Sequence, residues 1–140
     1  MKYLLDTCTI SELVKSRPNR KVVKWIEECD EDSIFLSVLT VGEIQKGISK
    51  LEDERRQVKI QRWLDSDLKT RFTDRIISVS EDVALTWGIL EGESESKGQP
   101  IPVIDVLIGA TALAYNLTVV TRNIDDIVQT GARVLNPWTL

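Results

Sequence analysis

Acidic side chains at a few places in the sequence could carry out chemistry together. Asp6 directly follows an apolar run, Asp105 lies inside another, and Glu43 and Asp126 stand beside small or polar residues. A lone carboxylate buried among apolar side chains costs several kcal/mol unless a partner or a metal ion compensates it. Carboxylates that converge repel one another unless a hard cation lies between them. These residue types therefore predict an all-oxygen Mg²⁺ or Mn²⁺ site, which would orient water for attack on a phosphodiester.

Asp6 follows the expected strand at residues 3–5 at once, where the simplest structural explanation is a helix cap. Thr9 and Glu12 have the spacing of a capping box, which predicts that the next helix begins near Thr9. Asp6 is then left at the carboxyl edge of the sheet without a structural role, which favours a functional one.

Asp105 lies within the apolar run Val103–Ala110. Gly109 and Ala112, one and two turns further along its helix face, predict open space in which a ligand could approach the carboxylate. The alternative is that Asp105, close behind Pro102, is only a favourable acid in the first turn of a helix.

Glu43 and Asn123 have equally good structural explanations. Thr40 and Glu43 have the spacing of a second capping box. The helix face that carries Glu43 continues one turn further to Gly47, which is again a small neighbour. Asn123 follows the last long expected strand, three residues before Asp126, and capping of a helix by Asn123 is at least as good an interpretation as function.

The sequence contains no histidine, which excludes histidine-dependent triads, acid–base pairs and the usual zinc sites. The net charge of −4 argues against a protein that coats duplex DNA but not against a metal-dependent nuclease. Glycine-rich nucleotide-binding motifs and a D-x-D phosphotransfer motif are absent from the sequence. Carboxylates are therefore left as the candidates for chemistry.

A basic strip runs between Leu13 and Ile26, with Lys15, Arg17, Arg20, Lys21 and Lys24 and no acid among them. A solvated helix face is the favoured interpretation, and a strip that contacts a nucleic-acid backbone is the alternative.

The chain favours one domain, residues 1–140, of three-layer α/β/α architecture with a short, mostly parallel central sheet. Strands are expected at residues 3–5, 34–38, 75–79, 117–120 and 133–135. Helices are expected at residues 20–29, 41–49, 52–67 and 125–129, and a further helix is expected to begin at residue 9. Another helix is expected from Ser78 or Ser80 to the polar stretch 93–98, and a buried helix is expected at 103–115. The carboxyl ends of parallel strands are where ligands bind, so this fold predicts that Asp6, the segment 37–43 and the segment 121–123 come together.

Cys8 and Cys29 have neither disulfide-framework nor zinc-site spacing, and Cys8 is expected to be a small buried residue. No run of about 20 apolar residues and no secretion signal is apparent. We therefore expect a cytoplasmic protein without a membrane segment.

Short motifs along nearly the whole chain resemble the PIN-domain nucleases of the VapC-type toxin group, including the closely similar FitB-like branch. The matching pieces are Leu4-Leu5-Asp6-Thr7, Ile10-Ser11-Glu12-Leu13, Leu36-Ser37, Thr40-Val41-Gly42-Glu43-Ile44 with Gly47, Asp105 with Ile108-Gly109-Ala110-Thr111-Ala112, Thr121-Arg122-Asn123 and Asn136-Pro137-Trp138. Each piece alone is weak, but their order and spacing are specific.

The resemblance implies a Mg²⁺-dependent endoribonuclease, with Mn²⁺ as a substitute, that is the toxin of a type II toxin–antitoxin pair. The implied residues are Asp6, Glu43, Asp105 and Asn123 as catalytic residues, Asp6 and Asp105 as metal ligands, and Thr7, Thr121 and Asp126 in support. For a nuclease of this kind, the weaker candidates for contacts with the RNA backbone are Lys15, Arg17, Arg20, Lys21 and Arg122. Asn123 stands where the family often has a further acid, and its amide oxygen or Asp126 could take that place. The expected partners are RNA, a small cognate antitoxin, and a second copy of the chain or a toxin–antitoxin hetero-oligomer.

Two other functions stay open. A PIN-like chain with an incomplete acidic set could be a protein- or DNA-binding module, and Asn123 is the feature that favours this. A Mg²⁺-dependent phosphohydrolase of small molecules would use the same carboxylates but would ignore RNA.

Overall fold

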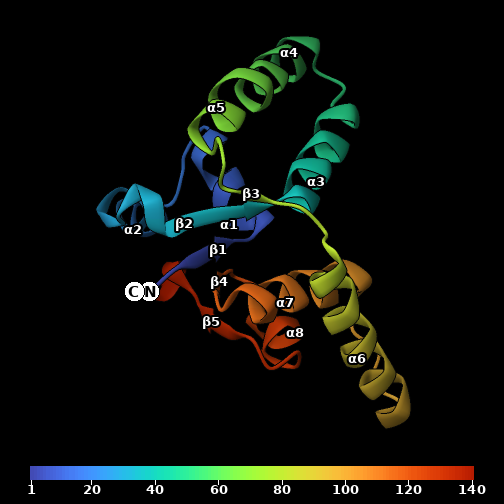
Figure 1. Cartoon of the computed structure of the whole chain (residues 1–140). Helices are drawn as coiled ribbons and strands as arrows, with labels where there is room; N and C mark the ends of the chain where they lie inside the picture. The colour runs from blue at the N-terminus through green and yellow to red at the C-terminus, as the bar shows by residue number, and fades with distance from the viewer.

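One five-stranded sheet forms the centre of the protein in the computed structural model, which describes all 140 residues (Figure 1). Its strands are β1 (Tyr3–Leu5), β2 (Ile34–Ser37), β3 (Ile76–Ile77), β4 (Thr118–Val120) and β5 (Arg133–Leu135). The order across the sheet is β3-β2-β1-β4-β5, and each neighbouring pair is parallel. The sheet, predicted to be mostly parallel, is therefore parallel throughout.

Helices connect the strands, because parallel neighbours need long crossover connections. They are α1 (Thr7–Ser11), η1 (Glu12–Val14), α2 (Arg20–Glu28), η2 (Glu31–Ser33), α3 (Val38–Ser49), α4 (Glu54–Arg62), η3 (Trp63–Leu68), α5 (Lys69–Arg71), α6 (Glu81–Lys97), α7 (Val103–Tyr115), α8 (Ile124–Val128) and η4 (Pro137–Thr139). None of them is both long and apolar enough to cross a membrane.

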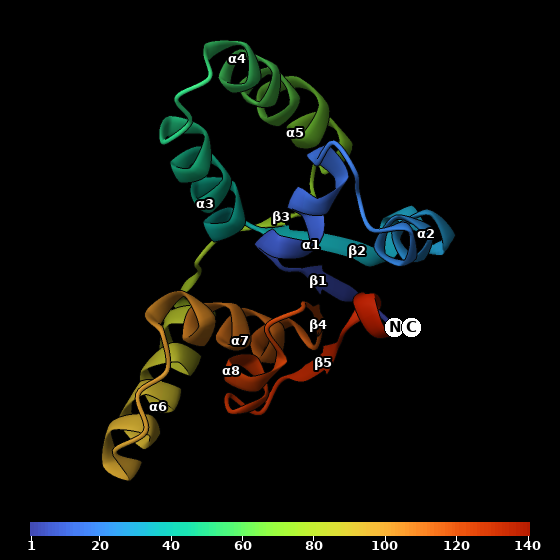
Figure 2. The ribbon, with the colours of Figure 1, turned by 180° about the vertical axis from the view of Figure 1, so that it is seen from behind.

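Successive side chains of the central strands bury opposite faces of the sheet, as the pleat requires. Leu5 and Val120 join a core cluster with residues of α1 to α4 and η3, whereas Leu4 and Val119 join a second cluster with residues of α7 and α8. Figures 1 and 2 show α3, α4 and α5 on one side of the sheet and α7 and α8 on the other. The predicted three-layer α/β/α architecture is confirmed.

The helical segment after α3 is longer and less regular than the helix predicted at residues 52–67. Asp53 caps its start by accepting hydrogen bonds from the N–H groups of Arg55 and Arg56 at 3.0 and 3.2 Å. The segment continues through η3, a π-helical stretch, to Arg71. A single buried stripe, made of Ile60, Leu64, Leu68 and Phe72, runs along the whole segment. This buried stripe holds the helical segment against the core. The strand β3 that follows is shorter than the predicted 75–79, and Ser78 and Val79 beyond it are exposed.

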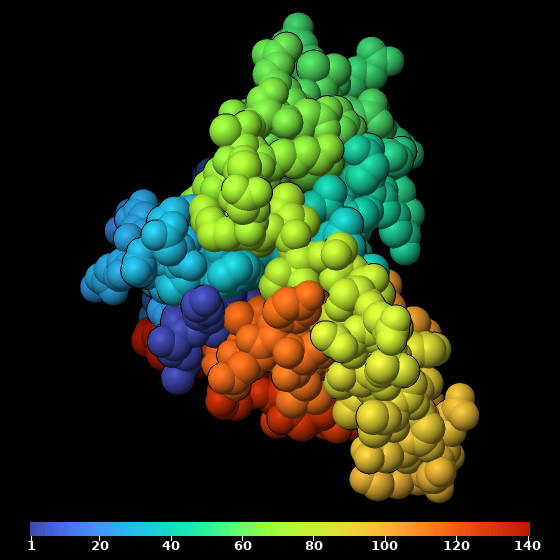
Figure 3. All heavy atoms as spheres, in the orientation of Figure 1, coloured from blue at the N-terminus to red at the C-terminus, as the bar shows by residue number.

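Helix α7 has the bounds predicted for it, and the prediction that it is buried holds for its central turn, where all residues from Ile108 to Ala112 are buried. Its two ends are not buried, because Val103, Leu113 and Tyr115 are each more than 40% exposed. The helix packs against α6, α8 and the sheet, and the far end of α6 stands out from the body of the molecule (Figure 3).

Gly109 of α7 does not open space beside Asp105, which corrects the expectation from the sequence. A Cβ on Gly109 would lie 2.3 to 2.7 Å from the side-chain atoms of Thr130, and Gly109 is buried. The missing side chain therefore allows the turn after α8 to approach the helix.

We expect Gly109→Ala to destabilise the protein by about 1–3 kcal/mol, because the added methyl group overlaps the Thr130 side chain. Gly88→Ala in α6 is the matched control, because nothing lies within 4 Å of its missing Cβ, and it should stabilise the protein by about 0.5–1 kcal/mol. Urea denaturation of both variants measures the difference. Equal stability of the two would contradict the packing role of Gly109.

Candidate active site

The carboxyl ends of β1, β2 and β4 meet at one edge of the sheet and bring polar side chains together. Asp6 follows β1, Ser37 ends β2, and Thr121 follows β4; all three are buried. The Asp6 N–H donates to the carbonyl oxygen of Val120 at 3.0 Å, so the residue after β1 is fixed by the strand beside it. This edge is where parallel sheets bind ligands.

Asp6 caps helix α1, so the predicted capping box at Thr9 is wrong. The Asp6 Oδ1 atom accepts a hydrogen bond from the Thr7 N–H at 2.9 Å, and α1 begins at Thr7. Thr9 lies inside the helix, and its hydroxyl donates to the Val120 carbonyl at 2.7 Å. The Thr121 hydroxyl donates to Asp6 Oδ2 at 2.8 Å. Asp6 therefore has a structural role and is held by both carboxylate oxygens.

Glu43 is not part of a capping box either, because α3 begins earlier than predicted. Ser37 caps this helix, its hydroxyl accepting a hydrogen bond from the Leu39 N–H at 3.0 Å. Glu43 thus lies beyond the first turn, and its Oε1 atom accepts a hydrogen bond from the Thr7 hydroxyl at 2.7 Å. This contact ties the acid of α3 to the residue beside Asp6.

Two neighbouring side chains complete this part of the site and were not foreseen from the sequence. Thr40 Oγ1 lies 3.3 Å from Thr7 Oγ1. The Cys8 thiol lies 3.9 Å from Asp6 Oδ2 and 3.5 Å from the Thr121 hydroxyl. Cys8 is half-buried rather than a small core residue, and only its position two residues after Asp6 could have suggested the contact.

Asn123 contacts the acids of the site and does not cap α8. Its side chain makes no cap hydrogen bond. Instead, its Nδ2 group donates to Asp105 Oδ2 at 3.3 Å and to Asp126 Oδ2 at 3.4 Å. Its backbone N–H donates to the Thr121 hydroxyl at 2.9 Å, which links Asn123 back to Asp6. The structure therefore brings these four side chains into one hydrogen-bonded chain with Asp6.

The carboxylates influence one another electrostatically. Burial, followed by the negative charges of Asp6, Asp126 and Glu43 and a hydrogen bond with Asp126, raises the pKa of Asp105 from 3.8 to about 6. Asp105 does lie in the first turn of α7, where the helix dipole favours a negative charge, but this effect is outweighed. Separate segments of the chain thus concentrate negative charge at one place.

The donor chemistry of this cluster suits a hard divalent cation, because carboxylate, amide and hydroxyl oxygens are the ligands that Mg²⁺ prefers. Asp6, Asp105 and Asn123 supply such oxygens, and the mutual repulsion at Asp105 is what a cation would relieve. No three Asp, Glu, Cys or His side chains are clustered tightly enough to enclose an ion as they stand. The metal-ligand roles of Asp6 and Asp105 stay predictions.

The predicted basic strip does not form one surface toward the acids. Lys15 lies beside the hollow that contains Glu43, but it makes an ion pair with the buried Glu12, with a Nζ–Oε1 distance of 2.8 Å. Arg17 and Arg20 line a hollow beside α2, and neither Thr7 nor Glu43 lies in its lining. Lys21 is exposed on α2. The Arg122 guanidinium lies 4.6 Å from the centre of the Trp138 ring, so it packs on the C-terminal segment.

A hollow of about 350 Å³ connects Glu43 to helix α4, which was not predicted to be near it. Thr7, Glu43 and Gly47 line it together with Arg56 and Trp63. The only signal in the sequence was the group of cations Arg55, Arg56 and Lys59 within the expected helix at 52–67, and it did not reveal what that helix packs against. Gly47 contributes open space here, because nothing lies within 4 Å of its missing Cβ.

A parallel sheet between two helix layers, with acids clustered at its carboxyl edge, is the architecture of a known class of nuclease-like domains, and comparison with known proteins identifies the same class. The PIN domain model matches residues 3–131, and the chain belongs to the PIN domain family.

Its relatives include toxins and ribonucleases. The chain is 31% identical to the toxin FitB of Neisseria gonorrhoeae over 96% of this chain and 97% of that protein. It is 30% identical to the VapC ribonuclease Y4jK of Sinorhizobium fredii over 96% of each chain. The crystal structure of FitAcB from Neisseria gonorrhoeae superposes with a TM-score of 0.93, 31% identity and 99% coverage of both chains.

We expect Asp105→Asn to stabilise the metal-free protein above pH 6. Because the pKa of Asp105 is higher in the folded state, folding loses stability as the pH rises from about 4 to 6, and this loss persists at higher pH. The substitution removes it, with a gain of about 1–2 kcal/mol after allowance for solvent screening.

Urea denaturation in EDTA at pH 7.5 and at pH 4 measures this gain, which should vanish at the lower pH. A variant that is less stable than the parent at pH 7.5 would show that the acids do not repel one another.

Proposed function

We propose that the protein is a metal-dependent endoribonuclease, the toxin of a type II toxin–antitoxin pair, that hydrolyses RNA phosphodiesters with a metal-activated water. The observation that supports this most strongly is the electrostatic coupling of Asp105 to Asp6 and Glu43, three acids supplied by separate elements. Structural acids are normally paired with cations, whereas these face one another at a ligand-binding edge.

Asp6 and Asp105 would hold Mg²⁺ or Mn²⁺, and Asn123 could add its amide oxygen. When bound, such an ion stabilises charge on the attacked phosphate and lowers the pKa of a bound water. Asn123 already contacts Asp105, and Thr121 orients Asp6, so both carboxylates are positioned by neighbouring hydrogen bonds.

Glu43 is the proposed base, which orients the attacking water and takes its proton. The Thr7 hydroxyl donates to Oε1 of Glu43, which leaves the Oε2 oxygen without a protein donor. In-line attack forms a bond from the water oxygen to phosphorus and breaks the P–O3′ bond, and the departing 3′ oxygen takes a proton from solvent. The products then carry a 5′-phosphate and a 3′-hydroxyl, whereas attack by the ribose 2′-hydroxyl would leave cyclic phosphates.

The partner proposed for this chain is a small antitoxin protein, because the FitB relative is itself named a toxin. The antitoxin would occupy the groove beside the acids, and a second copy of the chain would complete a homodimer or a larger hetero-oligomer. With RNA as its substrate, the protein would act in the cytoplasm.

The test is cleavage of total RNA by the purified, partner-free chain with Mg²⁺ or Mn²⁺. We expect cuts at discrete sites with 5′-phosphate ends, no cutting in EDTA or by Asp105→Asn, and a kcat lowered about 100- to 10,000-fold by Glu43→Gln. Sequencing of the ends and single-turnover kinetics supply these measurements. Cyclic-phosphate ends, or undiminished activity in EDTA, would rule out the metal–water route.

Removal of the Thr7 hydroxyl should reduce turnover without unfolding the protein. We expect Thr7→Val to lower kcat about tenfold with little change in KM, because Glu43 loses the hydrogen bond that orients it. Thr7→Ser keeps the hydroxyl and should retain most of the activity. An equal loss in both variants would argue that the methyl group matters and the hydrogen bond does not.

A second candidate function is a non-catalytic binding module, favoured by Asn123, whose amide is hydrogen-bonded between Asp105 and Asp126 where the family often has an acid. A folded chain that cuts no RNA and binds no Mn²⁺ by calorimetry would select this function.

A further inference from the structure

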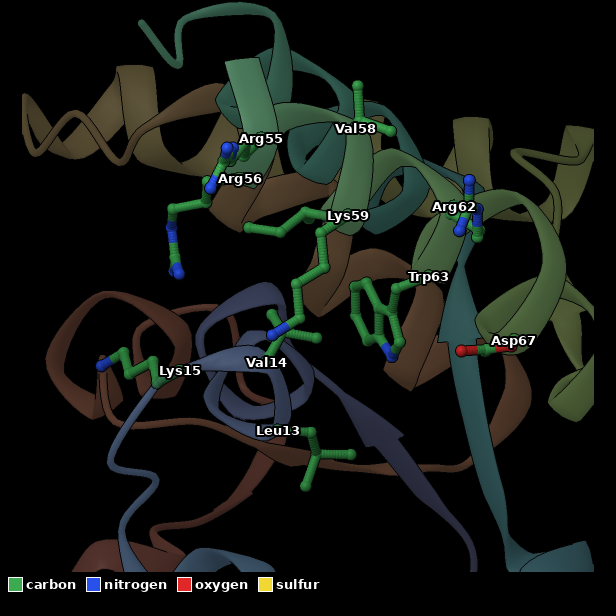
Figure 4. A pocket seen from close by; sticks show the side chains of 11 residues that line it. Leu13, Val14, Lys15, Arg55, Arg56, Val58, Lys59, Arg62, Trp63 and Asp67 are labelled. Atoms are coloured by element: carbon green, nitrogen blue, oxygen red, sulfur yellow. The ribbon is translucent and has the colours of Figure 1, made fainter. Parts of the chain in front are cut away.

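A further hollow, of about 520 Å³, lies between α4 and η1, and cations make up five of its 11 lining residues (Figure 4). Lys15, Arg55, Arg56, Lys59 and Arg62 contribute five positive charges to its lining, against the single carboxylate of Asp67. Figure 4 shows Arg56 and Lys59 reaching from α4 toward Val14 and Lys15, with the Trp63 ring beside Lys59. Positive charge thus gathers at this hollow in a protein whose net charge is −4.

The cations of α4 have no partner within the protein. Lys15 pairs with Glu12, but neither Arg55, Arg56, Lys59 nor Arg62 forms an ion pair. Like charges four residues apart on a helix, such as Arg55 and Lys59, destabilise it. An external polyanion would neutralise them, and a nucleic-acid backbone is the polyanion that repeats its charges along a strand.

This hollow shares a wall with the one that contains Thr7 and Glu43. Val14, Lys15, Arg56, Ile60 and Trp63 line both of them. A chain that passes Thr7 and Glu43 therefore runs directly along Trp63 and the basic side of α4. Trp63 is half-buried and packs on the core, so its ring is held in place rather than free to move.

Resting on the proposed nuclease function, we infer that this hollow binds the single-stranded RNA segment next to the cut. Arg56 and Lys59 neutralise its phosphates, and Trp63 stacks against one unpaired base. The volume of about 520 Å³ lies within the range of pockets that hold a small molecule, so one nucleotide fits inside. Base stacking on an aromatic ring also requires a base that is not already stacked in a helix.

The inference is tested by fluorescence anisotropy with a short fluorescein-labelled single-stranded RNA and Mg²⁺. All variants are made in the full chain with Asp105→Asn, which keeps the RNA intact. We expect Arg56→Ala and Lys59→Ala each to raise Kd about three- to tenfold and to reduce the slope of log Kd against log salt by about 0.7. Lys97→Ala, which removes an exposed lysine of α6 far from the hollow, is the matched control and should change neither quantity.

The stacking contact needs its own variants, because Trp63 also packs on the core. Trp63→Leu should raise Kd about tenfold, whereas Trp63→Phe keeps an aromatic face and should raise it less than threefold. RNA should quench part of the tryptophan fluorescence, and this quenching should disappear in Trp63→Phe. Thermal unfolding of each variant separates a folding defect from a binding defect.

The outcomes separate this inference from the proposed function. If the chain with Asp105 intact cuts RNA but Lys59→Ala and Trp63→Leu leave KM and Kd unchanged and the quenching persists in Trp63→Phe, the hollow does not bind RNA and the nuclease proposal stands. The same conclusion follows if these substitutions weaken only the binding of a protein partner. Equal affinity for duplex RNA would overturn the single-strand assignment, and a chain that neither cuts nor binds RNA would overturn both proposals.

Discussion

The site depends on the way Asp6 is held at the junction of β1 and β4. Its backbone N–H pairs with the Val120 carbonyl, one carboxylate oxygen caps α1, and the other accepts the Thr121 hydroxyl. One residue thus ends a strand, starts a helix and links two strands, so its carboxylate is oriented by the fold itself. Thr7 and Asn123 extend the same network to Glu43 and Asp105.

This arrangement places stability and function in opposition. The network that fixes the acids also brings their charges together, which raises the pKa of Asp105 and disfavours its ionised form. A protein selected for stability alone would separate such charges or pair them with cations. The cations of α4 are left unpaired a short distance away, and the two charged regions meet along a shared wall that includes Arg56 and Trp63.

Capping boxes were the weakest part of the sequence-based interpretation. Thr9 with Glu12 and Thr40 with Glu43 both have the required spacing, but the helices begin earlier, at caps formed by Asp6 and Ser37. In each case the residue at the end of a strand acts as the cap, because its extended backbone suits that position. The same error hid the structural role of Asp6 and offered Glu43 a structural role that it does not have.

The parallel α/β/α class, most element bounds and the set of acids at the sheet edge could be predicted from the amino-acid sequence, because apolar periodicity and strand-end positions are local features. The side-chain contacts could not be predicted in this way. Gly109 accommodates Thr130, Asn123 contacts Asp105 and Asp126, and the basic face of α4 adjoins Glu43. These contacts join residues far apart in the chain, and their geometry follows from how the helices pack on the sheet, which no local pattern encodes.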